Sequence, residues 1–413
     1  MLKTRRLPLN WFNPKRKIAK TLFTRFLANL VGAKIRLQSH HSTELLGDPQ
    51  SDQIIDIIIH DPCVYERIIS GGSIEAAETY IEGLWKTSDL HALLKIAAFN
   101  QARLDKLESG ISKLAQWTAK LRYKQHKNRK SQAKRNILSH YDLGNYFYST
   151  FLDKQMQYSC ALFDESSINP QHPENGLEQA QQQKIKRISK QLQLTSDDHL
   201  LEIGTGWGGL AIYAAQHYGC QVTTTTISDQ QYQYCCEQIH QLGLENKIQV
   251  LNRDYRDLHG YYDKLVSIEM IEAVGETYLP LFIRQCSKRL KPGGMMLLQS
   301  ITIADKRYQS YRKNTDFIQQ LVFPGGFLPC ESVLKTLFTK YNLQITDYLD
   351  MREHYIWTLR AWYHRLQQYR QKHSQTLGFN SQFFRLWNFY LAYSEAGFAS
   401  SNTGVCQFTL THQ

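Results

Sequence analysis

Several common features are missing from this chain of 413 residues. Its eight cysteines include no C-x-x-C pair and suggest no disulfide framework, so no metal site is predicted and a reducing compartment is expected. No apolar run approaches the roughly 20 residues that a membrane-spanning helix needs. The N-terminus also lacks the apolar core of a secretory signal.

Acidic residues are absent from two segments whose positive charges together exceed the net charge of +12. Residues 1–43 contain ten lysines or arginines, and residues 120–135 contain eight more. Such segments bind polyanions, either nucleic acid or an anionic membrane. Since no nucleic-acid-binding module is recognisable, an anionic lipid surface is the expected partner and nucleic acid is not. The alternative is that both segments are solvated linkers.

The basic N-terminus allows two further interpretations. It is compatible with a mitochondrial transit peptide, because it is rich in positive charge and free of acids. It is equally compatible with an amphipathic surface helix over Ile18–Leu37.

The most informative stretch is DHLLEIGTGWGG, residues 198–209. It predicts a buried strand at His199–Ile203, a glycine-rich turn and then a helix, which are the parts of a nucleotide-binding βα unit. Glycines let backbone N–H groups approach a ligand closely. Glu202 before the turn completes E-x-G-x-G-x-G, which is typical of S-adenosylmethionine (SAM) methyltransferases. The dinucleotide pattern G-x-G-x-x-G also fits, and a plain strand–helix turn is the third alternative.

After this turn, strands and helices alternate, which predicts a doubly wound, mostly parallel sheet. Two helices are expected at Ser228–Leu242 and Glu276–Leu290, and a tight turn at Lys291–Gly294. A helix over Glu178–Leu192 precedes the sheet. Seven strands are expected: His199–Ile203, Gln221–Thr226, Lys247–Leu251, Lys264–Met270, Met295–Ile303, Gln344–Tyr348 and Val405–Thr411.

The remaining segments are predicted to be mainly helical. Insertions are expected at 305–340 and 356–398, and the aromatic side chains of the second either pack in the core or line an apolar pocket. Towards the N-terminus we expect a strand in 52–60 and three helices, the first closed by Gly71–Gly72 and the third at Asp89–Phe99. Residues 106–135 are predicted to be a basic helical linker.

Nine segments together resemble the cyclopropane-fatty-acyl-phospholipid synthases and the related mycolic acid cyclopropane synthases. The match covers nearly the whole chain and keeps the segments in order. They are HYDLGNYFY (140–148), QYSCALF (157–163), LEIGTGWGG (201–209), TTISDQQ (225–231), SIEMIEAVGETY (267–278), LLQSITIADKRY (297–308), FIQQLVFPGGFLP (317–329), HYIWTLRAWYHRL (354–366) and GVCQFTL (404–410).

The resemblance implies a fold and a domain organisation. It implies a seven-stranded, Rossmann-like class I SAM methyltransferase domain with helical insertions over 136–413. A small α+β domain over 20–105 would associate with lipid. A basic tail (1–19) and the linker (106–135) would flank that small domain.

It also implies an activity. The family transfers a methylene group from SAM to the cis double bond of a phospholipid acyl chain, and bound bicarbonate deprotonates the carbocation. The enzyme would be cytoplasmic, bound peripherally to the inner face of the membrane, and could form a homodimer. Two alternatives remain: methylation without ring closure, or a lipid-binding protein with a decayed site.

The residues of the expected site follow from the matched segments. Cys160, Glu272, Tyr355 and the backbone of Ile301 would cradle bicarbonate, together with Gln299, which stands where many members have histidine. Taken alone, Cys160 could be a small buried residue, Tyr355 a core residue and Glu272 a solvated acid. The expected SAM contacts are Tyr158, Ser159, Glu202, Gly204, Gly206, Trp207, Gly208, Thr226, Ile227, Ser228, Gln231, Tyr255, Arg256 and Ile268.

Overall fold

The computed structural model describes residues 14–40, 42–101, 144–373 and 379–413. The chain divides into two compact units. The first unit comprises Met1–Leu121 and Leu377–Ser400, and the second unit comprises Arg122–Thr376 and Ser401–Gln413. Across the described ranges, no helix is both long and apolar enough to span a bilayer. The predicted linker at 106–135 lies outside these ranges.

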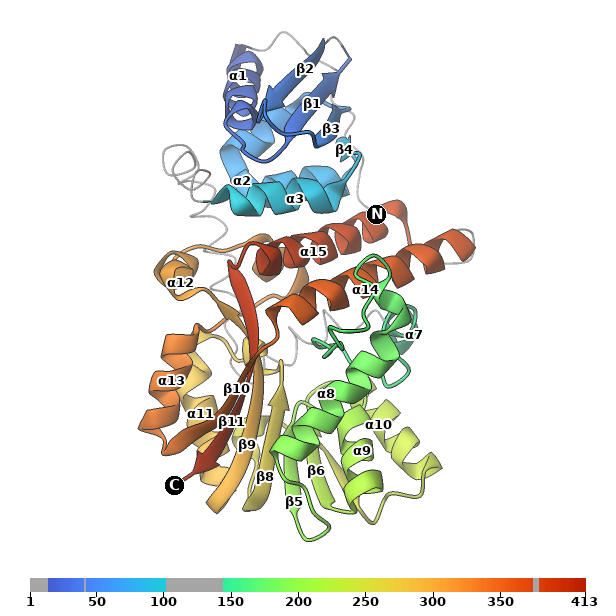
Figure 1. The fold of residues 1–413 in the computed structure, drawn as a ribbon, viewed down its shortest axis with the longest axis vertical. Coiled ribbons are helices and arrows are strands. Elements are labelled where there is room, and N and C mark those ends of the chain that lie inside the picture. The colour runs from blue at the N-terminus through green and yellow to red at the C-terminus, as the bar shows by residue number, and fades with distance from the viewer. Residues whose placement is uncertain (1–13, 41, 102–143, 374–378) are drawn as a thin grey trace. The chain divides into compact units, whose positions relative to one another are not determined.

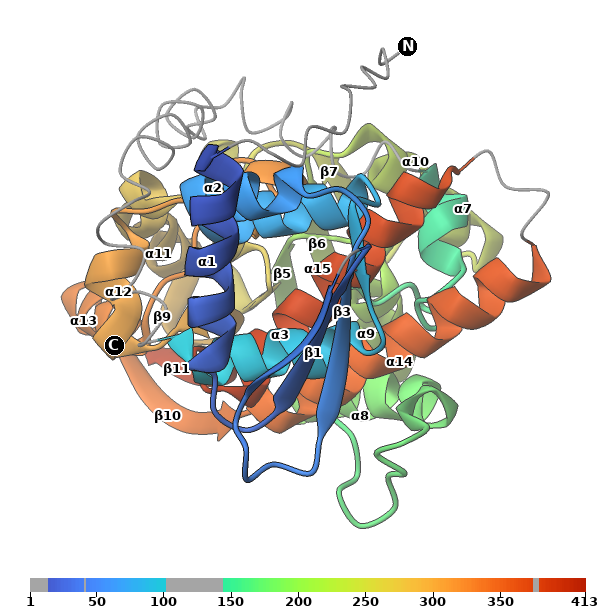
Figure 2. The ribbon, with the colours of Figure 1, turned by 90° about the horizontal axis from the view of Figure 1, so that it is seen from above.

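The first unit contains a four-stranded sheet in the order β2-β1-β3-β4. Its strands are β1 (Lys34–Ser39), β2 (Ser42–Gly47), β3 (Ile54–Ile59) and β4 (Trp85–Thr87). Strand β1 runs parallel to β3, whereas the β1–β2 and β3–β4 pairs are antiparallel. Figure 2 shows α1 (Pro14–Ala28) beside these strands.

The helix predicted over Ile18–Leu37 is wrong in its second half. Helix α1 ends at Ala28, and the chain enters β1 at Lys34. Within β1, Ile35 and Leu37 are buried while their neighbours are partly exposed, which is the two-residue period of a strand. Helix α1 also begins at Pro14, inside the segment predicted to be a tail.

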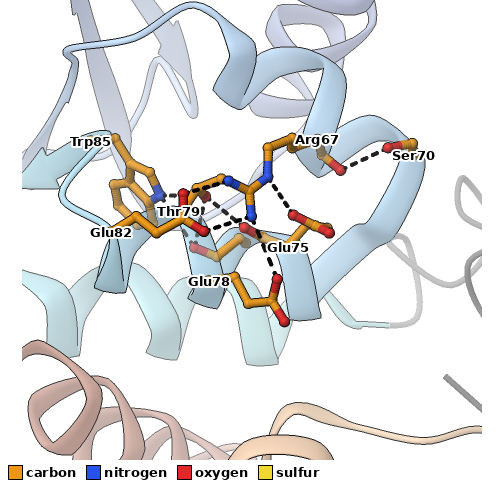
Figure 3. Close-up of polar contacts among 8 residues, drawn as sticks. Arg67, Ser70, Glu75, Glu78, Thr79, Glu82 and Trp85 are labelled. Atoms are coloured by element: carbon orange, nitrogen blue, oxygen red, sulfur yellow. Dashed lines mark hydrogen bonds and ion pairs between the residues drawn. The ribbon is translucent and has the colours of Figure 1, made fainter. Parts of the chain in front are cut away.

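Helix α2 (Cys63–Ile81) is broken at Gly72, whose φ of 61° and ψ of −140° are not helical. This confirms the predicted boundary between two helices. Arg67 bridges the break, since its Nε lies 2.6 Å from Glu75 and its Nη1 lies 2.6 Å from Glu82 (Figure 3). A Cβ at Gly71 would lie 2.1 Å from Cγ of Glu75, so glycine is needed for this approach.

Helix α15 (Ser381–Ala399) packs against α2 and α3 (Leu90–Phe99) within the first unit (Figures 1 and 2). The guanidinium of Arg385 lies 4.0 Å from the ring centroid of Tyr80. His91 Nδ1 lies 2.8 Å from a carboxylate oxygen of Glu395. The segment 377–400, which we expected in the catalytic domain, therefore belongs to the first unit. Many of its aromatic side chains serve core packing.

The second unit contains the predicted seven-stranded sheet, in the order β10-β11-β9-β8-β5-β6-β7. Strands β7, β6, β5, β8 and β9 are parallel, whereas β11 is antiparallel to both of its neighbours. The bounds are β5 (His199–Ile203), β6 (Gln221–Thr226), β7 (Ile248–Asn252), β8 (Tyr262–Ile268), β9 (Leu290–Ile303), β10 (Leu343–Asp350) and β11 (Thr403–His412).

Helices cover both faces of this sheet (Figure 1). Alternation along each strand produces the two layers: Leu200 packs with one set of helices and Leu201 with the other. The first layer contains α8 (Leu177–Gln191), α9 (Gly209–Tyr218) and α10 (Asp229–Gln241), and the second contains α11 (Leu279–Arg289) and α13 (Glu331–Lys340). Among the described residues, the second unit also contains the α-helices α7 (Gly144–Ser149), α12 (Asp305–Tyr311) and α14 (Arg352–Lys372).

The tight turn predicted at Lys291–Gly294 is wrong. Strand β9 already pairs with β8 at Leu290, and the register shifts before Lys264 pairs with Met295. The left-handed Gly293, with a φ of 74°, is thus accommodated in a bulge within the strand.

Candidate active site

The glycine-rich turn follows β5, as predicted, and leads into α9. Gly204, Gly206 and Gly208 all have positive φ, at 104°, 53° and 88°. A Cβ added at Gly208 would lie 2.6 Å from Sγ of Cys235, so this glycine is needed for helix packing. A Cβ at Gly206 would meet no atom within 4 Å. Gly206 therefore borders the open space that a ligand requires.

Glu202 lies beneath this turn, near the end of β5, and is buried. Its carboxylate accepts a hydrogen bond of 2.6 Å from Thr224 Oγ1, which also lies 2.7 Å from Thr205 Oγ1. Burial raises the pKa of Glu202 to about 8. The side chain thus ties the turn to the neighbouring strand, and its contact with SAM stays a prediction.

The residues predicted after the second strand of the sheet lie together at the carboxyl end of β6. Thr226 Oγ1 donates to Gln231 Oε1 over 2.9 Å, and Ser228 caps α10 by accepting from the backbone N–H of Gln231. All three side chains are buried, and Ile227 between them is half-buried. They form one ordered corner beside the glycine turn.

Tyr158 and Trp207 belong to one aromatic cluster. The ring centroid of Tyr158 lies 5.2 Å from that of Trp362 and 5.4 Å from that of Tyr148, which in turn lies 5.2 Å from Trp207. The indole N–H of Trp207 donates to Asn145 over 2.8 Å. Tyr158 and Trp207, both predicted to contact SAM, therefore pack in the same aromatic cluster.

The predicted Ser159 has a buried partner that the sequence analysis missed. Lys184 on α8 is fully buried, and its ammonium nitrogen lies 2.6 Å from Ser159 Oγ. Burial lowers the pKa of Lys184 to about 8, although the nearby carboxylates of Glu269 and Asp153 act in the opposite direction.

Tyr255 and Arg256 pack against the α11 side of the sheet. Tyr255 makes an edge contact with Phe282 at 5.3 Å, and Arg256 holds Asp254 at 2.7 and 2.6 Å. Ile268, the last residue of β8, keeps some exposed surface. The proposed contacts of these three residues with adenine stay predictions.

The centre of the site is a carboxylate that was not predicted. Glu269 follows β8 directly, with a left-handed φ of 49°. Its carboxylate accepts hydrogen bonds from Cys160 N–H at 2.9 Å, Gln299 Nε2 at 2.7 Å and Tyr355 O–H at 2.6 Å. Three residues predicted for the site thus donate hydrogen bonds to Glu269, which was not predicted. The available signal was an acid at the end of a buried strand, but the strand was expected to continue to Met270.

Glu272, which was predicted, lies in the turn after Glu269 and accepts a hydrogen bond from Ile301, another predicted residue. Its Oε1 accepts from Ile301 N–H at 2.6 Å and from Ser300 Oγ at 3.3 Å. Its Oε2 is buried without a hydrogen-bond partner among the described residues. Burial, together with the charge of Glu269, raises the pKa of Glu272 to about 8. Glu272 thus holds a proton more tightly than an exposed glutamic acid does.

The cradle predicted for bicarbonate does not fit a second anion in this arrangement. The donors that were assigned to bicarbonate, from Cys160, Gln299 and Tyr355, all point to Glu269. The backbone N–H of Ile301 is taken by Glu272. An additional anion would lack these donors and would be repelled by Glu269. The protein's own carboxylate fills the position.

A line of hydrogen bonds supports Gln299 from behind. Gln299 Oε1 accepts from Gln407 Nε2 at 2.9 Å, and Gln407 Oε1 accepts from Arg187 Nε at 3.1 Å. Arg187 also pairs with Asp347 on β10. Both glutamines are fully buried. The line therefore connects partly exposed charges to the buried site.

A separate polar cluster joins α14 to the turn at Pro173–Asn175. Glu174 accepts from His364 Nδ1 at 2.8 Å and lies 3.3 Å from His172 Nδ1. These three groups are close enough to hold a metal ion, which the sequence did not predict. Their direct pairing accounts for the cluster without an ion.

The strand order, with one antiparallel strand, and the acid-preceded glycine turn define a class I SAM-dependent methyltransferase. The chain belongs to the mycolic acid cyclopropane synthetase family, whose model matches residues 128–408.

Named relatives support this assignment. The chain is 35% identical to a tuberculostearic acid methyltransferase of Mycobacterium tuberculosis, over 89% of this chain and 85% of the relative. It is 33% identical to the cyclopropane-fatty-acyl-phospholipid synthase of Escherichia coli, over 75% and 76%. A crystal structure of a mycolic acid cyclopropane synthase complexed with SAH and CTAB is 26% identical. Its TM-score is 0.59, covering 67% of this chain and 98% of the other.

Proposed function

We propose that the protein transfers a methylene group from SAM to the cis double bond of an unsaturated phospholipid acyl chain, forming a cyclopropane ring. The observation that carries the proposal is the pair of carboxyl groups, Glu269 and Glu272, at the carboxyl end of β8. This end of the sheet also presents the glycine turn, and ligands of open α/β sheets bind there. SAM would supply an electrophilic methyl group, and the alkene π electrons would attack it.

The surrounding residues suit a cationic lipid intermediate. Tyr158 is half-buried and its ring lies against the buried Trp362, so it can tolerate a cation and help to keep out the water that would convert the cation to an alcohol. Glu269 adds a fixed negative charge, and electrostatic stabilisation of this kind is often the largest contribution to catalysis. The site can therefore both stabilise the cation and remove a proton from it.

Methylation without ring closure is the second candidate, because the relative that covers 89% of this chain is named a tuberculostearic acid methyltransferase. We favour the cyclopropane product because a base fixed beside the new methyl group can close the ring directly, with no hydride shift and no reductant. In the second candidate a 1,2-hydride shift would come first, and loss of a methyl proton would then leave an exo-methylene group.

Membrane association is part of the same proposal. The acyl chains of a bilayer reach an enzyme only at the membrane surface, and the basic segments at 1–43 and 120–135 suit the anionic inner face. A homodimer would place two copies of these segments on one surface and strengthen binding.

The experiment is incubation of the purified protein with methyl-deuterated SAM and vesicles of monounsaturated phospholipid. Cyclopropane formation predicts a gain of one CH₂ carrying two deuterons, with loss of the alkene signal and appearance of cyclopropane resonances in NMR. A retained or shifted double bond would favour the second candidate. If neither the acyl chain nor the head group of the lipid is modified, both candidate functions are contradicted.

A further inference from the structure

The carboxylate of Glu269 occupies a fully built anion position. It accepts three hydrogen bonds from different elements, of 2.9, 2.7 and 2.6 Å, and two of these donors are the uncharged side chains of Gln299 and Tyr355. Cys160 and Gln299 are fully buried, whereas Glu269 keeps part of its surface accessible. Glu269 is therefore the most accessible member of this cluster.

The backbone holds Glu269 in this position at a cost. A residue with a side chain at a φ of 49° is strained by about 1 kcal/mol or more, and such strain tends to collect at functional sites. An extended conformation at this position would continue β8 and turn the side chain away. The left-handed turn brings the carboxylate back to Cys160, which is 109 residues away in sequence.

The line from Arg187 fixes the orientation of Gln299. Arginine can only donate, so Gln407 must present its oxygen to Arg187 and its N–H group to Gln299. Gln299 must then present its own N–H group to Glu269. The line ends in a donor, which favours the ionised form of Glu269.

We propose that Glu269 is the general base that takes the proton released on ring closure, in place of bicarbonate. This inference rests on the proposed function. After methyl transfer, a C–H bond of the new methyl group breaks, and its electron pair forms the third bond of the ring. The proton goes to a carboxylate oxygen of Glu269 and passes to solvent before the next turnover. No further co-reactant is needed.

The electrostatics suit this role. Burial raises the pKa of the Glu269 carboxyl, while the hydrogen bonds from Tyr355, Cys160 and Gln299 act against that rise. A carboxylate with a raised pKa accepts a proton more readily than an exposed one.

Two variants test the proposal. Glu269→Gly vacates the position and suits the left-handed backbone, so the fold should persist. Glu269→Gln keeps the shape but cannot take a proton. Both should lose about 10²- to 10⁴-fold in turnover. Added bicarbonate should restore activity to Glu269→Gly, whose cradle is empty, but not to Glu269→Gln, whose amide still fills it. The wild-type protein should work equally well in bicarbonate-free buffer.

Gln193→Gly is the matched control, because Gln193 is exposed and has a similar φ of 52°. It removes backbone strain without touching the site and should leave turnover unchanged. Binding of ¹³C-bicarbonate, followed by NMR, provides a readout that does not depend on catalysis. Glu269→Gly should bind it, and the wild-type protein should not.

These outcomes distinguish failure of the proposed role of Glu269 from failure of the proposed function. Bicarbonate-dependent turnover of the wild-type protein, or full activity of Glu269→Gly in bicarbonate-free buffer, would overturn the role of Glu269. Equal bicarbonate binding by the wild-type protein and Glu269→Gly would do the same. Absence of any lipid product from the wild-type protein would instead remove the proposed function, and the binding comparison would still decide what fills the cradle.

Discussion

Gln407 donates its amide N–H to Oε1 of Gln299 over 2.9 Å, and this bond decides which end of the Gln299 amide faces Glu269. Both side chains project from neighbouring strands, since Gln299 on β9 pairs with Gln407 on β11. Arg187 sets the direction of this hydrogen bond: its guanidinium can only donate, so the amide oxygen of Gln407 must face it. An interaction remote from the reacting atoms thus sets the hydrogen bonding of the proposed base.

The first prediction concerns this orientation. In Gln407→Glu, the new carboxylate would accept from both Arg187 and Gln299, so the Gln299 amide would flip and present its oxygen to Glu269. Loss of a hydrogen bond to a charged group costs about 1.5–3 kcal/mol, so kcat should fall about 10- to 100-fold. The KM for SAM should not change. Gln344→Glu, an exposed substitution on β10, is the control. Unchanged kcat in Gln407→Glu would argue against an orienting role.

The second prediction concerns the glycine turn. Gly206→Val should abolish SAM binding, because the side chain would enter the open space next to the turn. Gly243→Val is the matched control: Gly243 has a φ of 65°, is exposed and has equally open surroundings at the end of α10. Calorimetric titration with SAM should show binding to the control only. Equal affinity in a folded Gly206→Val protein would refute the assignment of the turn.

The third prediction concerns Glu272. Since its pKa is about 8, the group is mostly neutral at pH 7, so Glu272→Gln should change stability little. It should leave SAM affinity intact and lower turnover about 10²- to 10⁴-fold, because we expect the proton taken by Glu269 to reach solvent through the neighbouring Glu272 carboxyl group, and an amide cannot relay it. Turnover with lipid vesicles and SAM affinity are the two measurements. Full turnover would show that Glu272 has only a structural role.

The fourth prediction concerns Glu202 and pH. Its folded-state pKa of about 8 lies above the ordinary glutamate value of 4.5, so the folded protein binds the proton more tightly than the unfolded chain does. The stability contributed by this group is fully present below pH 4.5 and is lost as the pH rises through 8. Glu202→Gln mimics the protonated form, so its melting temperature should fall less between pH 5 and pH 8 than that of the wild-type protein. Parallel melting curves for both proteins would contradict this.

The fifth prediction concerns membrane binding. The five residues Lys127, Arg129, Lys130, Lys134 and Arg135 lie outside the described residues, and their replacement by Gln should weaken binding to anionic vesicles. Each lost charge near the surface should cost on the order of 1 kcal/mol. Added salt should weaken wild-type binding too, because charges are screened over about 10 Å at 0.1 M.

The control for this fifth experiment removes the same charge from other parts of the second unit, outside the basic segment. Five exposed lysines are suitable: Lys186, Lys190, Lys288, Lys306 and Lys340. Sedimentation with vesicles should show weaker binding of the segment variant than of the control. Equal loss in both would indicate that only the net charge matters, and equal binding to neutral vesicles would exclude an electrostatic attraction.

The sequence alone determined the elements whose signals are local. Strands β5 and β6 have the predicted bounds, because each is a short run of strand-forming residues ended by turn residues. The break in α2 at Gly72 was equally readable, since two adjacent glycines interrupt a helical pattern. The resemblance in nine segments was sufficient to identify the family.

Only the tertiary structure decided what stands at the centre of that site. Glu269 reaches Cys160 across 109 residues and Tyr355 across 86, and no local pattern records such contacts. Its left-handed φ also depends on these partners, because a residue with a Cβ otherwise avoids the left-handed region. The same reason explains α15, whose aromatic face is apolar in sequence but acquires its neighbours, α2 and α3, only when the chain folds.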